Sequence, residues 1–190
     1  MSNQEQIELL RKVLADIDAE LVVTDSKQLP DTLLNLLKER QISSAALGGD
    51  TLLSELGIAD LLLKTGVGLI GPLKGDEPRD AVEEWHMALA GADAGITSAV
   101  GIALETGSVL LPPHTPDERA MSLLPPMHLV LLRTDQIFTD IGALLPAWTE
   151  SGQAVGSAVM VTGPSRTADI EKELVLGVHG PQAVTILLIG

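Results

Sequence analysis

Apolar residues recur along this chain in two alternating patterns, one spaced like the buried face of a helix and one continuous like a buried strand. Ile7, Leu10, Leu14 and Ile17 share one helical face, and residues 20–24 then form a short apolar strand. Short apolar strands that alternate with helices are typical of a mostly parallel sheet covered on both sides. We therefore predict an α/β fold of three layers, with a mostly parallel sheet and helices on both faces.

The same periodicity, with glycines and prolines as boundaries, predicts the remaining elements. Asp50 is expected to cap a short helix that follows it. Residues 119–124 are expected to form a short helix or turn. The predicted helices cover residues 30–40, 80–90, 140–150 and 167–174. The predicted strands cover residues 44–47, 67–70, 128–132, 157–162 and 184–189.

Residues 93–111 differ in composition from the preceding segments, because they are rich in glycine, alanine, threonine and valine. They predict two or three strands, with a tight turn at Glu105-Thr106-Gly107. We expect an antiparallel, glycine-rich hairpin inserted in the parallel fold. Neither an internal repeat nor a long linker divides the chain, so we expect one domain over residues 1–190.

Ligands of open α/β sheets bind at the carboxyl ends of the strands. The loops that reach this edge in the predicted fold follow Leu47, Ile70, Thr97, Leu132 and Thr162. These loops are where we expect a binding site.

The charge of the chain narrows the classes of partner. Its 190 residues carry 12 basic and 26 acidic side chains, a formal net charge of −14. Such a surface repels phosphate backbones and anionic lipid headgroups, which argues against nucleic-acid or membrane binding as the main role. The aromatic side chains are Trp85, Phe138 and Trp148, too few for base stacking.

Cysteine is absent, which excludes disulfides, thiolate catalysis and iron–sulfur clusters held by this chain alone. The first residues lack the basic and apolar regions of a signal peptide, and no apolar run is long enough to span a membrane. We therefore expect a soluble, cytoplasmic protein.

The sequence contains no convincing cofactor motif. Residues 66–71 match a dinucleotide fingerprint as text, but their glycines lie within a predicted strand and Pro72 follows, where the fingerprint needs a helix. The histidine spacing fits no metal site, and His128 is expected to be a buried core residue. We predict neither a metal nor an organic cofactor.

Residues 162–171 form one candidate anion site. The segment follows a predicted strand, is rich in small residues and begins a predicted helix, whose free backbone N–H groups attract anions. We predict that Thr162, Gly163, Ser165 and the isolated cation Arg166 contact a small anion. The alternative is that Ser165 or Thr167 caps the helix and Arg166 pairs with a nearby acid.

The hairpin supplies a second candidate, because Glu105 is the only charged residue between Asp93 and Asp117. A carboxyl group among apolar strands is expected to be partly buried, with a raised pKa that suits acid, base or nucleophilic catalysis. The alternative is that Glu105 points to solvent from its turn.

Other polar residues near these segments are candidates to reach the same ligand. Arg119 is an isolated cation, Thr97 lies at a strand end, and His179 lies in a turn-rich loop before the last strand. A simpler interpretation makes Thr97 a strand hydroxyl that bonds to the backbone and Arg119 an ion-pair partner of Glu105. The predicted further ligand contacts are Thr97, Thr106, Gly107, Arg119 and His179.

Several of these segments together resemble the lactate-utilisation protein C family, the LUD domain. The resemblance covers about half of the chain, from Asp93 to the end. The matching segments are residues 95–97, 103–108, 118–119, 122–125 with His128, 162–171 and 176–181. One departure is that members often carry Gly-Ala-Asp where this chain has Ser98-Ala99-Val100, so an acid is missing at Val100.

The resemblance implies a fold similar to that of ribose-5-phosphate isomerase, glucosamine-6-phosphate deaminase and the CoA transferases. In CoA transferases, a glutamate in a Glu-Asn-Gly context is the nucleophile, and Glu105-Thr106-Gly107 is similar. A shared fold does not by itself carry a shared function.

The resemblance also implies a biological setting, the oxidation of L-lactate to pyruvate by a three-protein iron–sulfur system. This chain resembles the member that lacks cluster-binding cysteines. Our first hypothesis is a non-redox component that binds a small anionic metabolite or docks on an iron–sulfur partner, and it is compatible with a homo-oligomer. An independent enzyme that acts on a sugar phosphate or CoA ester through Glu105, and a regulatory module that senses a metabolite, stay open as alternatives.

Overall fold

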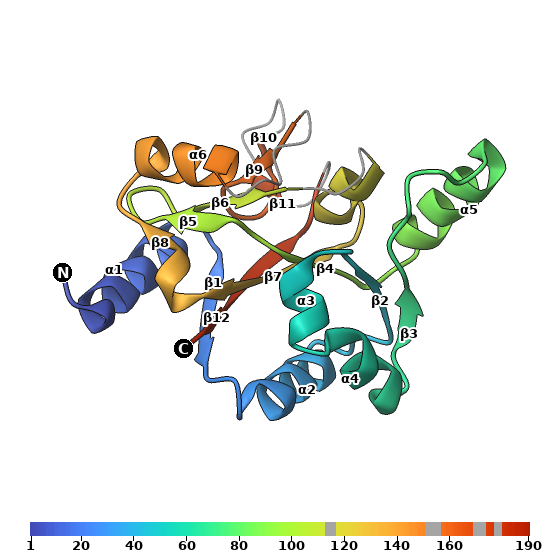
Figure 1. Ribbon diagram of the computed structural model, residues 1–190, viewed down its shortest axis with the longest axis horizontal. Coiled ribbons are helices and arrows are strands. Elements are labelled where there is room, and N and C mark those ends of the chain that lie inside the picture. The colour runs from blue at the N-terminus through green and yellow to red at the C-terminus, as the bar shows by residue number, and fades with distance from the viewer. Residues whose placement is uncertain (113–116, 151–156, 169–173, 177–179) are drawn as a thin grey trace.

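The computed structural model describes residues 1–112, 117–150, 157–168, 174–176 and 180–190 (Figure 1). A six-stranded, fully parallel sheet lies at its centre. Its strands, in spatial order, are β1 (Glu20–Thr24), β12 (Ala183–Ile189), β7 (Met127–Arg133), β4 (Ala94–Ser98), β2 (Ser44–Leu47) and β3 (Gly68–Ile70).

Helices cover one face of this sheet. They are α2 (Leu29–Glu39), α3 (Thr51–Glu55) and α4 (Ile58–Thr65). Alternate residues of the strands point toward these helices, so that Ile96 of β4 and Leu129 of β7 share one apolar core with Leu33, Leu53 and Leu62. Asp50 caps α3, as the sequence predicted.

The opposite face is covered by helices and by a second sheet. The helices are α1 (Asn3–Asp16), α5 (Arg79–Ala90) and the 3₁₀ helix η1 (Asp117–Ser122). The second sheet has the order β8 (Ile137–Phe138), β5 (Gly101–Ala103), β6 (Ser108–Leu111) and β9 (Val159–Val161). On its outer side lies α6 (Ile141–Glu150), whose Leu144 packs against Ala103 and Leu110.

The glycine-rich segment forms the predicted hairpin. Residues 93–111 contain β4, β5 and β6, and the chain reverses at residues 104–107, where Gly107 has a φ of 69°. That φ lies in the left-handed region, which glycine adopts without strain. The α/β fold with a mostly parallel sheet, helices on both faces and an antiparallel hairpin is therefore confirmed. The dinucleotide-like glycines lie in and around β3 with no helix directly after them, so that match is coincidental.

Two expectations about the C-terminal part are wrong. The strand expected at residues 157–162 is present as β9, but it pairs antiparallel with β6 in the second sheet, so the loop after Thr162 does not follow a strand of the parallel sheet. The helix expected at residues 167–174 is replaced at both ends by strands, β10 (Arg166–Ala168) and β11 (Leu174–Leu176), which pair antiparallel. Antiparallel pairing of these two nearby segments replaces the helix, and β-branched residues such as Thr167 and Val175 favour strands.

The connections of the parallel sheet reverse direction between β2 and β4. From β2 the chain continues through α3 and α4 to β3, on the outer side. From β4 it continues through the second sheet, on the other face, to β7. Neighbouring strands whose connections leave in opposite directions open a crevice at their carboxyl ends, which is where ligands of such folds bind.

The described part of the chain contains no helix that is both long and apolar enough to cross a membrane.

Candidate functional site

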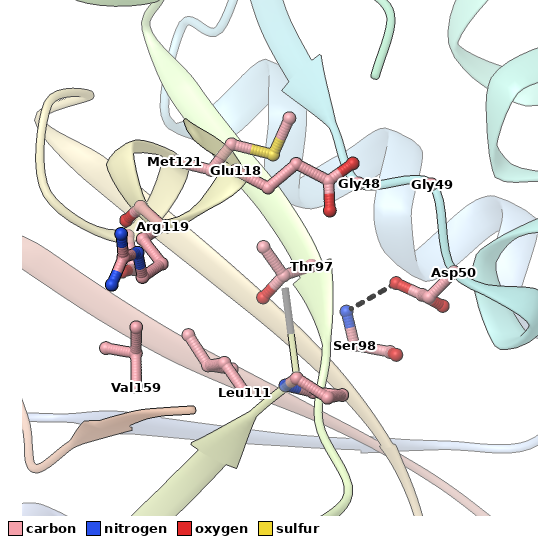
Figure 2. Close-up of a pocket in the computed structure, with 12 residues that line it drawn as sticks. Gly48, Gly49, Asp50, Thr97, Ser98, Leu111, Glu118, Arg119, Met121 and Val159 are labelled. Carbon is pink, nitrogen blue, oxygen red and sulfur yellow. Dashed lines mark hydrogen bonds between the residues drawn. The ribbon is translucent and has the colours of Figure 1, made fainter. Parts of the chain in front are cut away.

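A cleft lies at the carboxyl ends of β2 and β4, at the point where the chain connections reverse (Figure 2). Its cavity volume is about 20 Å³, within about 340 Å³ of empty space that includes open solvent. Its walls come from the loop after β2, the end of β4, η1 and the adjoining edge of the second sheet. The lining residues are Gly48, Gly49, Asp50, Thr97, Ser98, Leu111, Pro112, Glu118, Arg119, Met121, Ser122 and Val159.

Asp50 joins the two strand ends at the base of this cleft. Its Oδ1 accepts a hydrogen bond from Leu53 N at 3.0 Å, and its Oδ2 accepts one from Ser98 N at 3.1 Å (Figure 2). The side chain is only 7% exposed. Because each oxygen accepts a backbone N–H, the carboxylate holds the loop after β2 against the end of β4.

Gly49 allows η1 to approach the loop after β2. A Cβ at this position would lie 3.3 Å from Glu118 Oε1 and 3.2 Å from Pro72 Cβ. Those separations are tighter than ordinary van der Waals contact. A side chain at position 49 would therefore require Glu118 or Pro72 to shift by a few tenths of an ångström.

Two consecutive residues of η1 bring opposite charges to the cleft. Glu118 is buried, and its carboxylate extends toward Gly48 and Gly49 (Figure 2). Arg119 is exposed, leaves η1 in a different direction, and donates from Nη1 to Ser157 Oγ at 3.3 Å. The cleft thus has a carboxylate at one end and a guanidinium at the other.

Thr97 presents a hydroxyl between these charges and rests on a buried histidine. Thr97 Oγ1 and His128 Nε2 lie 2.9 Å apart, and His128 is fully buried. Burial lowers the pKa of His128 to about 4, because a charged imidazolium loses its hydration in the core. The expectation that His128 is a core residue is confirmed, and its ring is neutral at pH 7.

This set of side chains suits a small ligand that carries a carboxylate and a neighbouring oxygen. Arg119 supplies donors for the carboxylate, Glu118 an acceptor, and Thr97 a hydroxyl. The described residues contain no cluster of three or more histidine, aspartate or glutamate side chains that could hold a metal.

Thr97 and Arg119 are the predicted site residues that line the cleft. Thr106 and Thr162 lie elsewhere, joined through Ser108, whose Oγ is 2.8 Å from Thr106 Oγ1 and 2.7 Å from Thr162 Oγ1. This chain of hydroxyls ties the start of β6 to the end of β9.

Gly107 and Gly163 lie beside the same hydroxyls, close to the end of α1. A Cβ on Gly163 would lie 2.5 Å from Ile17 O, and one on Gly107 would lie 3.0 Å from Ile17 Cδ1. Both glycines allow this close approach to α1. Their contact with a ligand stays a prediction.

Ser165 lies at a third place, where its N–H donates to Pro181 O at 3.0 Å. The backbone of Arg166 belongs to β10, so the helix N-terminus expected there is wrong. The Arg166 side chain and His179 lie outside the described residues. Anion binding by this segment stays a prediction.

Glu105 is exposed at the hairpin turn, so the partial burial expected from its apolar neighbours is wrong. Its Oε1 accepts a long hydrogen bond of 3.5 Å from Ile141 N. The turn lies at the end of β6 opposite Leu111, which lines the cleft, and three strand residues span about 10 Å. A catalytic role for Glu105 stays a prediction, separate from the cleft.

Val100, where an acid is missing, lines a neighbouring depression together with Arg133. Arg133 Nη2 lies 3.3 Å from Glu55 Oε2 in the same depression. Glu55 on α3 therefore provides a carboxylate for this cation although position 100 is apolar.

The sequence analysis did not identify Gly48, Gly49, Asp50 and Glu118 as site residues. A signal for the first three was present, because they directly follow a predicted strand at an edge where ligands bind. For Glu118 the signal was its place in the family-matching segment 118–119, whereas its position in the cleft depends on how η1 packs over β4.

Comparisons with known proteins agree on one family. The family model described as the LUD domain matches residues 7–189. The uncharacterized protein YkgG of Escherichia coli K12 is 32% identical over 172 residues, which cover 88% of this chain and 71% of that protein. Lactate utilization protein C of Bacillus pumilus is 29% identical over 196 residues, covering 100% of this chain and 80% of that protein.

A second protein of that name, from Bacillus subtilis, is 28% identical over 198 residues and covers 99% of this chain and 80% of its own length. A crystal structure of a DUF162 family protein from Deinococcus radiodurans superposes with a TM-score of 0.69 at 21% identity, covering 100% of this chain and 99% of that one. This similarity confirms the α/β fold. Because the family model matches residues 7–189, nearly the whole of this chain, the chain belongs to the LUD domain family.

Proposed function

We propose that this protein acts in lactate utilisation by binding a small hydroxy- or oxo-carboxylate in the cleft between β2 and β4. Its relatives from the two Bacillus species are named lactate utilization protein C, which supports this setting. The observation that carries the proposal is the lining of the cleft, where Arg119, Glu118 and Thr97 meet at the reversal of the chain connections.

The chemistry of a 2-hydroxy acid matches this lining. The guanidinium of Arg119 can donate hydrogen bonds to the ligand carboxylate. The carboxylate of Glu118 can accept a hydrogen bond from the ligand hydroxyl. The net charge of −14 opposes the approach of any anion, so the attraction depends on the local cation. We therefore expect binding to weaken as salt screens Arg119.

Oxidation of lactate releases two electrons, which an acceptor must take up. The chain has no cysteine to hold an iron–sulfur cluster. We therefore place electron transfer on iron–sulfur partner proteins and ligand binding on this chain. The alternative, an independent enzyme acting through Glu105, has less support, because that carboxylate is exposed and outside the cleft.

The test is calorimetric titration of the purified protein with L-lactate and pyruvate. Arg119→Ala should weaken binding at least tenfold, because a charge-assisted hydrogen bond contributes about 1.5–3 kcal/mol. The matched control is Arg79→Ala, which removes another exposed arginine, paired with Glu83 on α5 at 2.9 Å and absent from the cleft. The control should bind like the wild type.

Equal affinities in Arg119→Ala and the wild type would remove Arg119 from the binding site. Absence of heat and of a thermal shift with either ligand, in the wild type, would contradict small-carboxylate binding by this chain alone.

A further inference from the structure

The hydrogen bond between Thr97 and His128 links the cleft to the core. Thr97 is half-buried and lines the cleft, whereas His128 lies beneath it on β7, opposite Gly95 of β4. Gly95 allows η1 to close over this place, because a Cβ there would lie 2.2 Å from Met121 O. The imidazole is therefore sealed from water by η1 and the sheet.

The surroundings of the ring select its tautomer. A neutral imidazole carries one hydrogen, on either Nδ1 or Nε2. Nδ1 of His128 is buried and has no hydrogen-bond partner in the described part of the chain. A hydrogen on Nδ1 would leave a buried N–H unsatisfied, which proteins avoid more strictly than an unused acceptor. The hydrogen therefore belongs on Nε2, which faces Thr97.

This tautomer decides what Thr97 can offer a ligand. When Nε2–H donates to Thr97 Oγ1, the hydroxyl hydrogen of Thr97 is not used by His128. The hydroxyl can then donate that hydrogen into the cleft. With the opposite tautomer, Thr97 would donate to Nε2 and could only accept from a ligand.

We propose that His128 is a positioning residue that makes the Thr97 hydroxyl a hydrogen-bond donor to a ligand oxygen, which favours a carbonyl or carboxylate oxygen at that point of the cleft. The ligand part of this inference rests on the proposed function. It adds the direction of one hydrogen bond, because Thr97 would donate to the carbonyl oxygen of pyruvate or to the hydroxyl oxygen of L-lactate, both of which can accept.

The tautomer can be measured without any ligand. Long-range ¹H–¹⁵N spectra of protein labelled at histidine nitrogens should show, at pH 7, a protonated Nε2 and a bare Nδ1 for His128. The resonances are assigned by subtraction, using His86→Gln, His114→Gln and His179→Gln, so that His128 itself stays intact. A protonated Nδ1, or a ring protonated on both nitrogens, would overturn the proposal.

The donor role is measured by titration of two Thr97 variants with pyruvate. Thr97→Val keeps the shape of the side chain but has no hydroxyl, and should bind pyruvate about tenfold more weakly. Thr97→Ser keeps the hydroxyl and should stay within about twofold of the wild type. Wild-type affinity in Thr97→Val would overturn the donor role.

The two measurements separate the two possible failures. A wild type that binds neither pyruvate nor L-lactate overturns the proposed function and the ligand part of this inference. The nitrogen spectrum then still decides whether His128 donates to Thr97.

Discussion

Burial controls the protonation of His128. The imidazole is completely enclosed, and loss of hydration lowers its pKa from 6.5 to about 4. The 3₁₀ helix that packs over β4 carries one buried acid, Glu118. Desolvation is nonetheless the cause of the shift, so the native ring stays neutral where the unfolded chain would already take up a proton.

This difference predicts how stability depends on pH. Between pH 6.5 and 4 the unfolded chain binds more protons than the native protein, so the free energy of unfolding falls as pH falls through that window. The shift from 6.5 to about 4 corresponds to about 3 kcal/mol. His128→Gln has no ring to titrate, so its free energy of unfolding, measured by urea denaturation, should fall less between pH 7 and pH 4.5 than that of the wild type.

The carboxylates titrate in both proteins, so the difference between the two profiles isolates His128. Parallel profiles for the wild type and His128→Gln would contradict a neutral, buried imidazole.

At the scale of elements, two aspartates hold the strands β2 and β4 together by hydrogen bonds, one at each end of the pair. Asp50 joins the carboxyl ends and forms the base of the cleft. Asp93 joins the amino ends, where its Oδ2 accepts from N and Oγ of Ser43, at 2.8 and 2.7 Å, and from N and Oγ of Ser44, at 2.9 and 3.0 Å. The pair that frames the cleft is thus held at both ends by side chains.

Asp93→Asn should destabilise the protein by about 2 kcal/mol, because the amide replaces a charged acceptor with a weaker one. Hydrogen bonds from the Ser43 side chain and backbone hold the pKa of Asp93 below its usual value of 3.8. This contribution is therefore present above pH 3.8 and lost as pH falls through the lowered pKa.

The measurement is urea denaturation at pH 7, with Glu39→Gln, an exposed acid at the end of α2, as control. A free energy of unfolding for Asp93→Asn equal to that of the control would contradict the stabilising role of Asp93 between β2 and β4.

At the scale of the whole molecule, two apolar cores share the central sheet. Leu129 of β7 faces the helices α2, α3 and α4, and Val130 faces the second sheet and α1. On the side that faces the parallel sheet, the second sheet has no core of its own, because Ile102 and Val109 bury their side chains against the strands of the parallel sheet. We therefore expect the chain to unfold as one domain.

The two tryptophans allow a test of this expectation. Trp85 packs on the parallel sheet beside Met121, and Trp148 packs on the second sheet beside Leu144. Trp85→Phe and Trp148→Phe leave one reporter each, and their fluorescence should change at urea midpoints that agree with circular dichroism of the same variant. Separate midpoints for the two probes of one variant would indicate two folding units.

Local sequence predicts the elements whose residues bury one face against the sheet. The strands at residues 20–24 and 44–47 and the helix at 30–40 follow from apolar spacing, because burial of a periodic face largely decides secondary structure. The parallel fold then places its ligand edge after Leu47 and Thr97, and the cleft lies there. These inferences need only the chain order of the elements.

Tertiary structure alone decided which side chains meet. Glu105 is exposed because its turn projects beyond the apolar strands, and β10 forms because it finds β11. His128 lies under Thr97 because β7 pairs with β4, which no local pattern specifies. Sequence by itself determined the family resemblance, the alternating elements and the edge of the sheet at which ligands of such folds bind. The cleft's charges and its buried histidine depend on strand register and on the path of η1, which are set by contacts between residues far apart in the chain.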